Sequence, residues 1–405
     1  MRSRGEYIIT KSEVHAYAEE WLGAAIRLEY QGYKCTRSVL LQVLLIAAAR
    51  VVSLFAACRS LADAPSDQTI RNALAATLPE IGELERRLNL ALVRGVPKAL
   101  RRKSRMVAID LTLIPYHGQP AYDPKEIFRG EPKSGTTHFH AYATAVVVHS
   151  GYRYTLALTR VEYGDSMKEV VQRLLAIVRR RNVKIRFLLL DKGFFSVEVL
   201  QYLRRAGHGF IIPAFVRGRK PKDPKTPPHG LRALLKKKDG YYRETLTAGP
   251  TKEKKRTSTT VTICVASKHY TEKKTGKRRR KKLLYAIWKV RRTPQEIRET
   301  YRKRFGIETT YRQMNEARIK TCTRDPRLRL LFVGIALVLR NVWVWIHFRF
   351  AKGKFGPEPQ LFLELLRFKE MLLWITQVVQ HLLRADTILG LDVQTYERVM
   401  AAYQP

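Results

Sequence analysis

The sequence predicts an α/β fold, in which a mixed sheet with helices on its faces is interrupted by a β-rich insertion and preceded by an all-helical domain. Residues 1–100 contain only runs with helical spacing. From residue 105 onward, the runs follow in the order strand, strand, strand, helix, strand, helix, strand. Residues 217–290 add further β segments before a long helix. This order is typical of a mixed sheet covered by helices.

The N-terminal domain is predicted from four helical runs, at residues 11–32, 38–62, 65–80 and 81–96. The third run opens with Pro65 and Ser66, a cap-like start, and carries Arg71 and Asn72 on one face with other side chains of base-reading types. This face is either the DNA-reading helix of a helix-turn-helix or the solvated face of a small bundle. We assign residues 1–100 to DNA binding or dimerisation.

The sheet is predicted from strands at 105–116, 140–150, 152–163, 185–191 and 209–216, with helices at 166–181 and 196–207. The insertion contains two more β segments and exposed basic loops, of which KRRRKK at 277–282 is either a solvated loop or a phosphate contact. Pro294 begins a long helix that extends to residue 319, with Thr293 as its cap. The predicted regions are a central domain at 105–216 and 291–348, the insertion at 217–290, and a helical C-terminal region at 349–405.

The charge of the chain indicates a polyanionic partner. Its 405 residues include 76 Lys and Arg against 35 Asp and Glu, a net charge of +41. Such a chain repels itself strongly unless a polyanion neutralises it. DNA or RNA is the leading partner class, and an anionic membrane surface is the competing one.

Two apolar stretches, residues 39–58 and 328–348, approach the length of about 20 residues that a membrane span requires. Each has an arginine near its middle, Arg50 and Arg340, and an arginine at the centre of a membrane helix costs about 2.5–3.5 kcal/mol. We therefore expect buried core helices and no membrane partner. The first twenty residues lack the apolar core of a signal peptide, so we expect a cytoplasmic protein.

Histidine and cysteine side chains do not form a clear metal-ligand set. The four cysteines, at positions 35, 58, 264 and 322, are far apart and lack zinc-ligand spacing. His138 and His140 would share one face of a strand. A polar strand face is the favoured interpretation of this pair, with a metal site as the alternative.

Two aspartates follow apolar runs of the buried-strand type. Asp110 comes directly after MVAI in the first strand, and Asp191 comes directly after FLLL in the fourth. An acid in this position lies at the carboxyl edge of a strand, where open α/β sheets bind their ligands. Either aspartate alone could equally be a strand-ending turn residue. Two in one sheet, followed by a glutamate on a later helix, are harder to explain by accident.

That glutamate, Glu308, lies among cations. At about 100° per residue, one third of the helix circumference holds Tyr301, Arg304, Glu308, Arg312 and Asn315. Beside a nucleic acid, this stripe would supply one acid for a metal ion and several donors for phosphate. The alternative is an ordinary salt bridge between Arg304 and Glu308, which are four residues apart.

Three carboxylates that meet at a sheet edge can hold two Mg²⁺ or Mn²⁺ ions, because hard cations prefer oxygen ligands. Two metal ions roughly 3.5–4 Å apart activate the attacking oxygen and stabilise the leaving oxygen of a phosphoryl transfer. We therefore predict that Asp110, Asp191 and Glu308 are catalytic metal ligands.

The segments around these acids resemble the Asp-Asp-Glu transposases of prokaryotic insertion sequences. The resemblance rests on AIDLTLIPY, LLLDKGFF and YRKRFGIETTYR, and covers roughly residues 105–345. The third segment is similar to the signature Tyr-x2-Arg-x3-Glu-x6-Lys of one transposase group. The lysine of that signature is replaced by Asn315, so Arg312 or Arg318 would have to make its DNA contact.

The resemblance implies an RNase H-like catalytic domain whose acidic triad binds Mg²⁺ or Mn²⁺. It also implies that Tyr301 and Arg304 contact DNA near the cleaved end, and we add Lys192 and Arg312 as further phosphate contacts. The expected protein is a nucleoid-associated transposase that binds terminal inverted repeats, cleaves double-stranded DNA at the ends and joins the 3′-hydroxyl to target DNA. Pairing two DNA ends favours a homodimer.

Two other functions stay open at this point. A transposase relic would bind the DNA ends without cutting them, and the three intact acids argue against it. A structure-specific nuclease of the same fold would cut branched or single-stranded DNA without strand transfer and without preference for repeat-ended duplexes. Metal-dependent cutting of repeat-ended DNA distinguishes the three functions.

Overall fold

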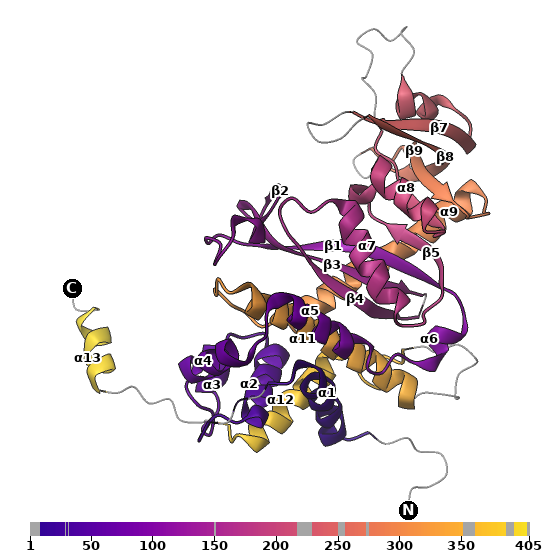
Figure 1. Cartoon of the computed structure of the whole chain (residues 1–405). Helices are drawn as coiled ribbons and strands as arrows, with labels where there is room; N and C mark the ends of the chain where they lie inside the picture. Colours follow the sequence, from indigo (N-terminus) through magenta and orange to yellow (C-terminus); the bar gives the residue numbers. More distant parts are fainter. Residues whose placement is uncertain are drawn as a thin grey trace, which may run out of the picture.

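A computed structural model describes residues 9–28, 30, 32–149, 151–216, 229–249, 256–272, 275–350, 361–385 and 393–402. Figure 1 shows a twisted sheet with helices against it and a bundle of helices beneath. The predicted α/β class is confirmed, with a mixed sheet, flanking helices and a helical N-terminal region.

Within the described residues, one sheet has the strand order β2-β3-β1-β5-β6-β9-β8-β7, and β4 pairs with β3. Its first six strands are β1 (Arg105–Pro115), β2 (Phe128–Lys133), β3 (Thr136–Val148), β4 (Arg153–Val161), β5 (Ile185–Leu190) and β6 (Phe210–Pro213). Pairing is parallel between β1 and β5 and between β5 and β6, and antiparallel between β1 and β3. The short β2 was not predicted, because Gly130 and Pro132 interrupt any apolar alternation there.

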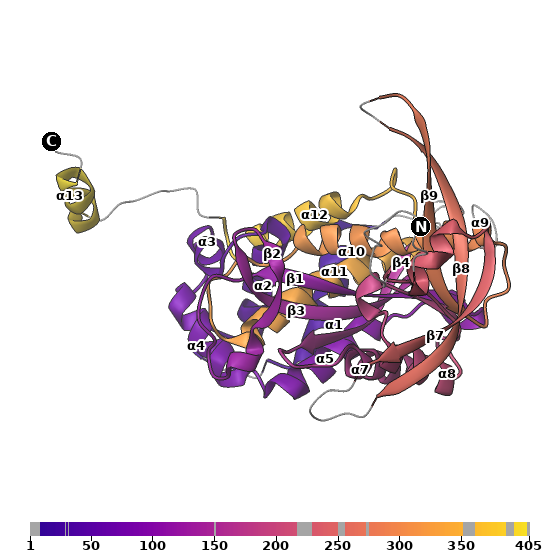
Figure 2. The ribbon, with the colours of Figure 1, turned by 90° about the horizontal axis from the view of Figure 1, so that it is seen from above.

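The insertion extends the same sheet. It contributes β7 (Gly240–Ala248), β8 (Thr257–Thr271) and β9 (Arg278–Trp288), and β9 pairs antiparallel with β6. The predicted basic loop at 277–282 is wrong in part, because Arg278 to Lys282 belong to β9 and pair with β8. Figure 2 shows the ends of β8 and β9 projecting beyond the body as a two-stranded ribbon. The Pro-rich run at 217–228 lies outside the described residues.

The N-terminal and C-terminal helices pack together. The bundle contains α1 (Lys11–Ile26), α2 (Arg37–Arg50), α3 (Leu54–Arg59), α4 (Asp67–Thr77), α5 (Ile81–Val93), α11 (Pro326–Phe350) and α12 (Phe368–Leu382). In it, α11 lies against α5, and α12 lies against α1 and α2. The single helix predicted at 38–62 is two helices, because Val51 adopts a left-handed conformation and Ser53 caps a new start.

The apolar stretch at 328–348 forms the centre of α11. By length and composition this helix could cross a membrane, but 94% of its most apolar window is buried inside the protein. Arg340 is buried there and donates hydrogen bonds to Gln313 Oε1 at 3.0 Å and to the Arg153 carbonyl at 3.1 Å. The charge in the middle of the stretch is therefore bonded within the protein, as expected for a core helix.

Shorter helices cover the sheet. Figure 2 places α10 and α11 on one face of the central strands and α7 on the other. These and the remaining elements are α6 (Lys98–Arg102), α7 (Met167–Arg179), α8 (Val197–Arg205), α9 (Pro294–Arg302), α10 (Gly306–Asn315), α13 (Val393–Ala401), η1 (Pro124–Glu126), η2 (Lys192–Phe194), η3 (Gly230–Lys236) and η4 (Lys303–Phe305). Ser166 caps α7 in a capping box with Glu169, and Thr293 caps α9 as predicted, with Pro294 at its first turn.

Candidate active site

Asp110 and Asp191 are neighbours because of the parallel pairing of β1 with β5. The last pair in that register is Ile109 with Leu190, and each aspartate is the next residue. β5 ends there, whereas β1 continues to Pro115 beside β3. The strand predicted at 105–116 is therefore confirmed, but the expectation that Asp110 lies at its carboxyl edge is wrong, because the apolar alternation of LTLIP continues the strand past it. The edge that both acids share is the carboxyl end of β5.

Glu308 reaches this edge from α10. The long helix predicted over 294–319 is divided into α9, a 3-10 turn at η4, and α10. Gly306 begins α10 where a Cβ would lie 2.5 Å from Nε of Arg153, so a larger residue here would require the guanidinium end of the Arg153 side chain to move. Tyr301 and Arg304 are buried, while Glu308 is more than half exposed.

One guanidinium contacts all three acids. Nη1 of Arg304 lies 2.8 Å from Oδ2 of Asp110, and Nη2 lies 3.3 Å from Oδ1 of Asp191 and 3.4 Å from Oε1 of Glu308. The Arg304 side chain is 7% exposed, against 14% for Asp110, 40% for Asp191 and 54% for Glu308. The predicted salt bridge between Arg304 and Glu308 and the predicted acid cluster are therefore both present. We call these three carboxylates and Arg304 the acid–arginine cluster.

The electrostatics of the cluster follow from its burial. Burial raises the pKa of the Asp110 carboxyl to about 6, the Arg304 charge opposes this, and the Asp191 charge adds to it. Burial lowers the pKa of Arg304, but the neighbouring Tyr301 and the three acids outweigh that effect and raise it above its ordinary value. Because burial opposes its ionisation, the Asp110 carboxylate is stabilised by the nearby positive charge of Arg304.

Tyr311 positions Asp110 and was missed in the sequence. Its hydroxyl donates to the Asp110 carbonyl at 2.8 Å, and the Thr144 hydroxyl is 2.8 Å from the same Tyr311 oxygen. Since the tyrosine proton is used on the carbonyl, Thr144 is the donor in the second bond. Thr144 is the β3 partner of Asp110, and Tyr311 follows Glu308 by three residues on α10. That helical spacing is the signal that could have found it.

The chain matches the family model described as the transposase DDE domain over residues 101–341. This chain belongs to the DDE transposase family. It is also similar in structure to a piggyBac transposase, solved by cryo-EM as a synaptic complex with hairpin DNA. The TM-score is 0.53 at 14% identity, and the match covers 99% of this chain and 86% of that one. A comparison with curated proteins found no match.

The other residues predicted near the transposase site lie around the cluster. Tyr301 is buried and packs against Tyr285 with ring centroids 5.3 Å apart. Lys192 opens η2 directly after Asp191, and its ammonium lies 4.3 Å from the centroid of the Phe215 ring. Arg312 is exposed on α10. Asn315, at the signature lysine position, accepts a hydrogen bond from Nε of Arg318 at 3.2 Å.

Arg71 and Asn72 lie on α4, far from the acids of the transposase. Figure 1 shows α4 in the helical bundle, at the opposite end of the molecule from β7, β8 and β9. Both side chains are exposed; Arg71 pairs with Asp67, and the Asn72 amide oxygen accepts a hydrogen bond from Gln68 at 2.8 Å. They stay predicted DNA contacts at a second surface.

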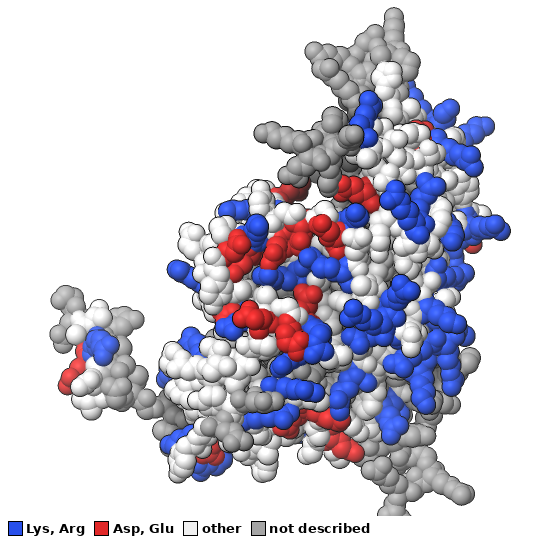
Figure 3. Space-filling model, in the orientation of Figure 1, with Lys and Arg blue, Asp and Glu red and all other residues white. Residues whose placement is uncertain are grey.

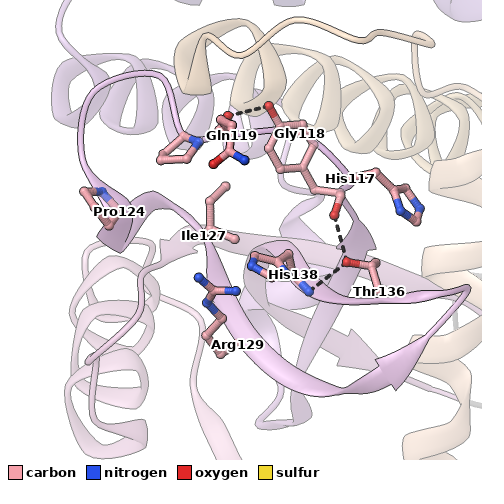
Figure 4. A pocket seen from close by; sticks show the side chains of 10 residues that line it. His117, Gly118, Gln119, Pro124, Ile127, Arg129, Thr136 and His138 are labelled. Atoms are coloured by element: carbon pink, nitrogen blue, oxygen red, sulfur yellow. Dashed lines mark hydrogen bonds between the residues drawn. The ribbon is translucent and has the colours of Figure 1, made fainter.

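A pocket of about 420 Å³ lies at the far end of β1 in the transposase (Figure 4). Its polar lining includes His117, Gln119, Arg129 and His138. His140 lies outside it, buried with its ring centroid 4.6 Å from that of Tyr116. The two histidines predicted on one strand face therefore have separate environments.

The acid–arginine cluster fits a divalent ion by its donor types. Three carboxylates are the oxygen ligands that Mg²⁺ and Mn²⁺ prefer, and all three already converge on one cation. Among the described residues, no three His, Cys, Asp or Glu side chains form a ready-made metal cluster. The guanidinium of Arg304 lies among these three acids of the transposase.

Proposed function

We propose that this transposase binds the terminal inverted repeats of an insertion sequence, cleaves the DNA at the ends and joins the 3′-hydroxyl to target DNA. The observation that carries the proposal is the convergence of Asp110, Asp191 and Glu308, from three separate segments, at the carboxyl end of β5. An ordinary helix salt bridge would explain Glu308 but neither aspartate.

In this proposal the three acids hold two Mg²⁺ or Mn²⁺ ions. Bound ions of this kind activate the attacking oxygen and stabilise the leaving oxygen of a phosphoryl transfer. Tyr311 holds the backbone of Asp110 through a hydrogen bond to its carbonyl. Arg304 and Tyr301 orient the phosphate backbone at the cleaved end, and Lys192 and Arg312 add phosphate contacts at the rim.

The DNA-binding surface extends to the ribbon of β8 and β9. Its exposed cations on the described residues are Lys268, Lys277, Arg278, Arg279, Arg280 and Lys281. A two-stranded β-ribbon fits into the major groove of B-DNA, which is about 12 Å wide. Figure 3 shows further Lys and Arg side chains gathered along the side of the molecule that carries α6, α8 and α9.

Neutralising the opposed lysines of the ribbon is expected to stabilise the protein and weaken DNA binding. Lys268 and Lys281 are directly paired across the strands and both exposed, and like charges in this arrangement are destabilising. The double variant Lys268→Thr, Lys281→Thr should gain roughly 0.2–1 kcal/mol in urea unfolding. In DNA binding, the negative slope of log K against log salt should become less steep by about 1.8, for two lost phosphate contacts.

The matched control keeps the charges. Lys268→Arg with Lys281→Arg preserves both cations and their repulsion, so stability and salt slope should stay at the wild-type values. An unchanged salt slope in the threonine variant would remove these two lysines from the DNA-binding surface.

The helical N-terminal domain supplies a second DNA surface or the dimer contact in this proposal. A homodimer brings two DNA ends together, which joining both ends to one target requires. The exposed face of α4 with Arg71 and Asn72 is the part of the bundle that we propose for reading the repeat.

The function is tested with the wild-type protein on a duplex that carries the repeat from the end of its own element. With Mg²⁺ we expect nicking at the repeat boundary and transfer of the new 3′-end to a target plasmid, and with Ca²⁺ only binding. Binding without cutting in either metal would support a DNA-binding relic. Cutting of branched DNA with no preference for the repeat would support a nuclease of the same fold. The cleavage products are separated on a denaturing gel. This gel also shows whether the excised end is a hairpin, as in the DNA of the piggyBac complex.

A further inference from the structure

Arg304 acts in this structure as a cation inside the site. Its two terminal nitrogens contact three carboxylates, and its guanidinium carbon lies 5.6 Å from the Tyr301 ring centroid and 5.2 Å from that of Phe305. With 7% of the side chain exposed, it has little surface to offer to a DNA backbone. A phosphate-binding arginine would be open to solvent, so this position requires its own explanation.

The charges of the acid–arginine cluster explain why Arg304 is buried there. Three ionised carboxylates close together repel each other, and a buried cation reduces that repulsion. A divalent ion placed among the same oxygens would be repelled by the guanidinium and would compete with it for the same lone pairs. Arg304 and a metal ion are therefore alternative counter-ions of one site.

We propose that Arg304 is an internal counter-ion that holds the three acids together in the absence of metal and must leave them when the first divalent ion binds. The proposal rests on the proposed function of this site. The released guanidinium then becomes available to a DNA phosphate, which joins the buried state of Arg304 to its predicted role at the cleaved end. Metal binding and DNA binding consequently support each other.

The contacts of Arg304 allow this exchange. Only the bond to Asp110, at 2.8 Å, is short, while those to Asp191 and Glu308 are long and involve partly exposed acids. Nε of Arg304 is buried without a hydrogen-bond partner. The residue belongs to η4, the 3-10 turn between α9 and α10, and a single tight turn between two helices is a common hinge position. The hydrogen-bonding capacity of the Arg304 guanidinium is thus not fully used in its buried position.

The test measures Mn²⁺ binding to the protein without DNA, by titration calorimetry and by the electron spin resonance signal of free Mn²⁺. We expect Arg304→Gln to bind Mn²⁺ at least about tenfold more tightly than wild type, because a competing positive charge has been removed. Arg302→Gln is the matched control: it removes a charge from the exposed face of α9 and should leave the affinity within about twofold.

Thermal unfolding gives a second readout that needs no activity. Without metal, Arg304→Gln should melt below wild type, because three acids lose their counter-ion. Saturating Mn²⁺ should raise its melting temperature by more than it raises that of wild type. If Arg304→Gln does not fold, Arg304→Lys keeps a charge without the two-nitrogen fork, and should bind Mn²⁺ more tightly than wild type by a smaller factor.

The outcomes separate this inference from the proposed function. If wild type and Arg304→Gln bind Mn²⁺ with equal affinity, and Asp110→Asn does not bind it, the counter-ion role is overturned and the metal site stays in place. No Mn²⁺ binding to any variant would also overturn it, and Mg²⁺-dependent cutting by wild type would then decide the proposed function by itself. Tighter binding in Arg304→Gln that disappears in the double variant with Asp110→Asn would support the inference.

Discussion

Asp110→Asn is expected to abolish strand cleavage while leaving binding to the repeat ends intact. The substitution keeps the shape of the side chain and removes the charge that a metal ion requires. Asp110 is also the most buried of the three acids. A loss of at least about 10³-fold in the cleavage rate corresponds to about 4 kcal/mol of transition-state stabilisation.

The same loss is expected for Asp191→Asn and for Glu308→Gln. If the three acids act as one metal site, double substitutions should cost little more than single ones, because residues that act as a unit are not additive. Rates are measured by single-turnover nicking of a labelled repeat-ended duplex with Mg²⁺, and binding by gel shift with Ca²⁺.

Glu299→Gln provides the matched control. Glu299 is an exposed acid on α9, paired with Arg298 at 3.7 Å, and its removal changes the net charge by the same amount. Its cleavage rate should stay within about twofold of wild type. Full cleavage by any one of the three triad variants would remove that residue from the site, and Glu308 would then be an ordinary salt-bridge partner of Arg304.

The meeting of the two aspartates could be predicted because it depends on local signals. An apolar run followed by an acid marks a strand and its edge, and two parallel neighbours share that edge. The strand predicted at 105–116 matches β1, Arg105–Pro115. The apolar run before Asp110 could not show that this aspartate lies within the strand, paired with Thr144 of β3, because an acid within a strand resembles an acid after one.

The position of Arg304 depends on structure far from it in the sequence. Helical spacing predicts that it lies on one face with Glu308, but not whether that face meets solvent or the sheet. Arg304 lies in the 3-10 turn at η4, and the following Gly306 lies against the Arg153 side chain of β4. These contacts join segments about 150 residues apart, and a pattern within one helix contains no information about them.

The packing of the two terminal regions was equally beyond the sequence. Apolar stretches predicted core helices correctly, but the partner of each helix is chosen by tertiary packing. The pairing of α11 with α5 and β4 joins the predicted N-terminal domain to the sheet. Polar residues at that junction have the largest expected effect on stability.

Asn341→Leu is expected to destabilise the protein by about 3 kcal/mol or more, because the buried N–H and carbonyl of Thr155 lose their side-chain partner. The Leu92 carbonyl loses one of its two side-chain hydrogen bonds and keeps the one from the Tyr154 hydroxyl at 3.1 Å. The fully buried Asn341 amide donates to the carbonyls of Leu92 at 2.9 Å and Thr155 at 2.8 Å, and accepts from the Thr155 N–H at 3.0 Å. β4 pairs only with β3 among the described strands, so the outer edge of β4 obtains its hydrogen bonds from this side chain.

Urea unfolding monitored by circular dichroism measures the effect, with Asn72→Leu on the exposed face of α4 as the control, where a change below about 0.5 kcal/mol is expected. Asn89 bonds the same edge at Leu158, through its amide nitrogen at 2.7 Å and its oxygen at 2.9 Å. Asn89→Leu should therefore cost a similar amount. Because β4 supports β3, and β3 supports the strand that carries Asp110, both variants should also lower the temperature at which cleavage is lost. A loss of less than about 1 kcal/mol in both would show that the edge of β4 is satisfied in another way.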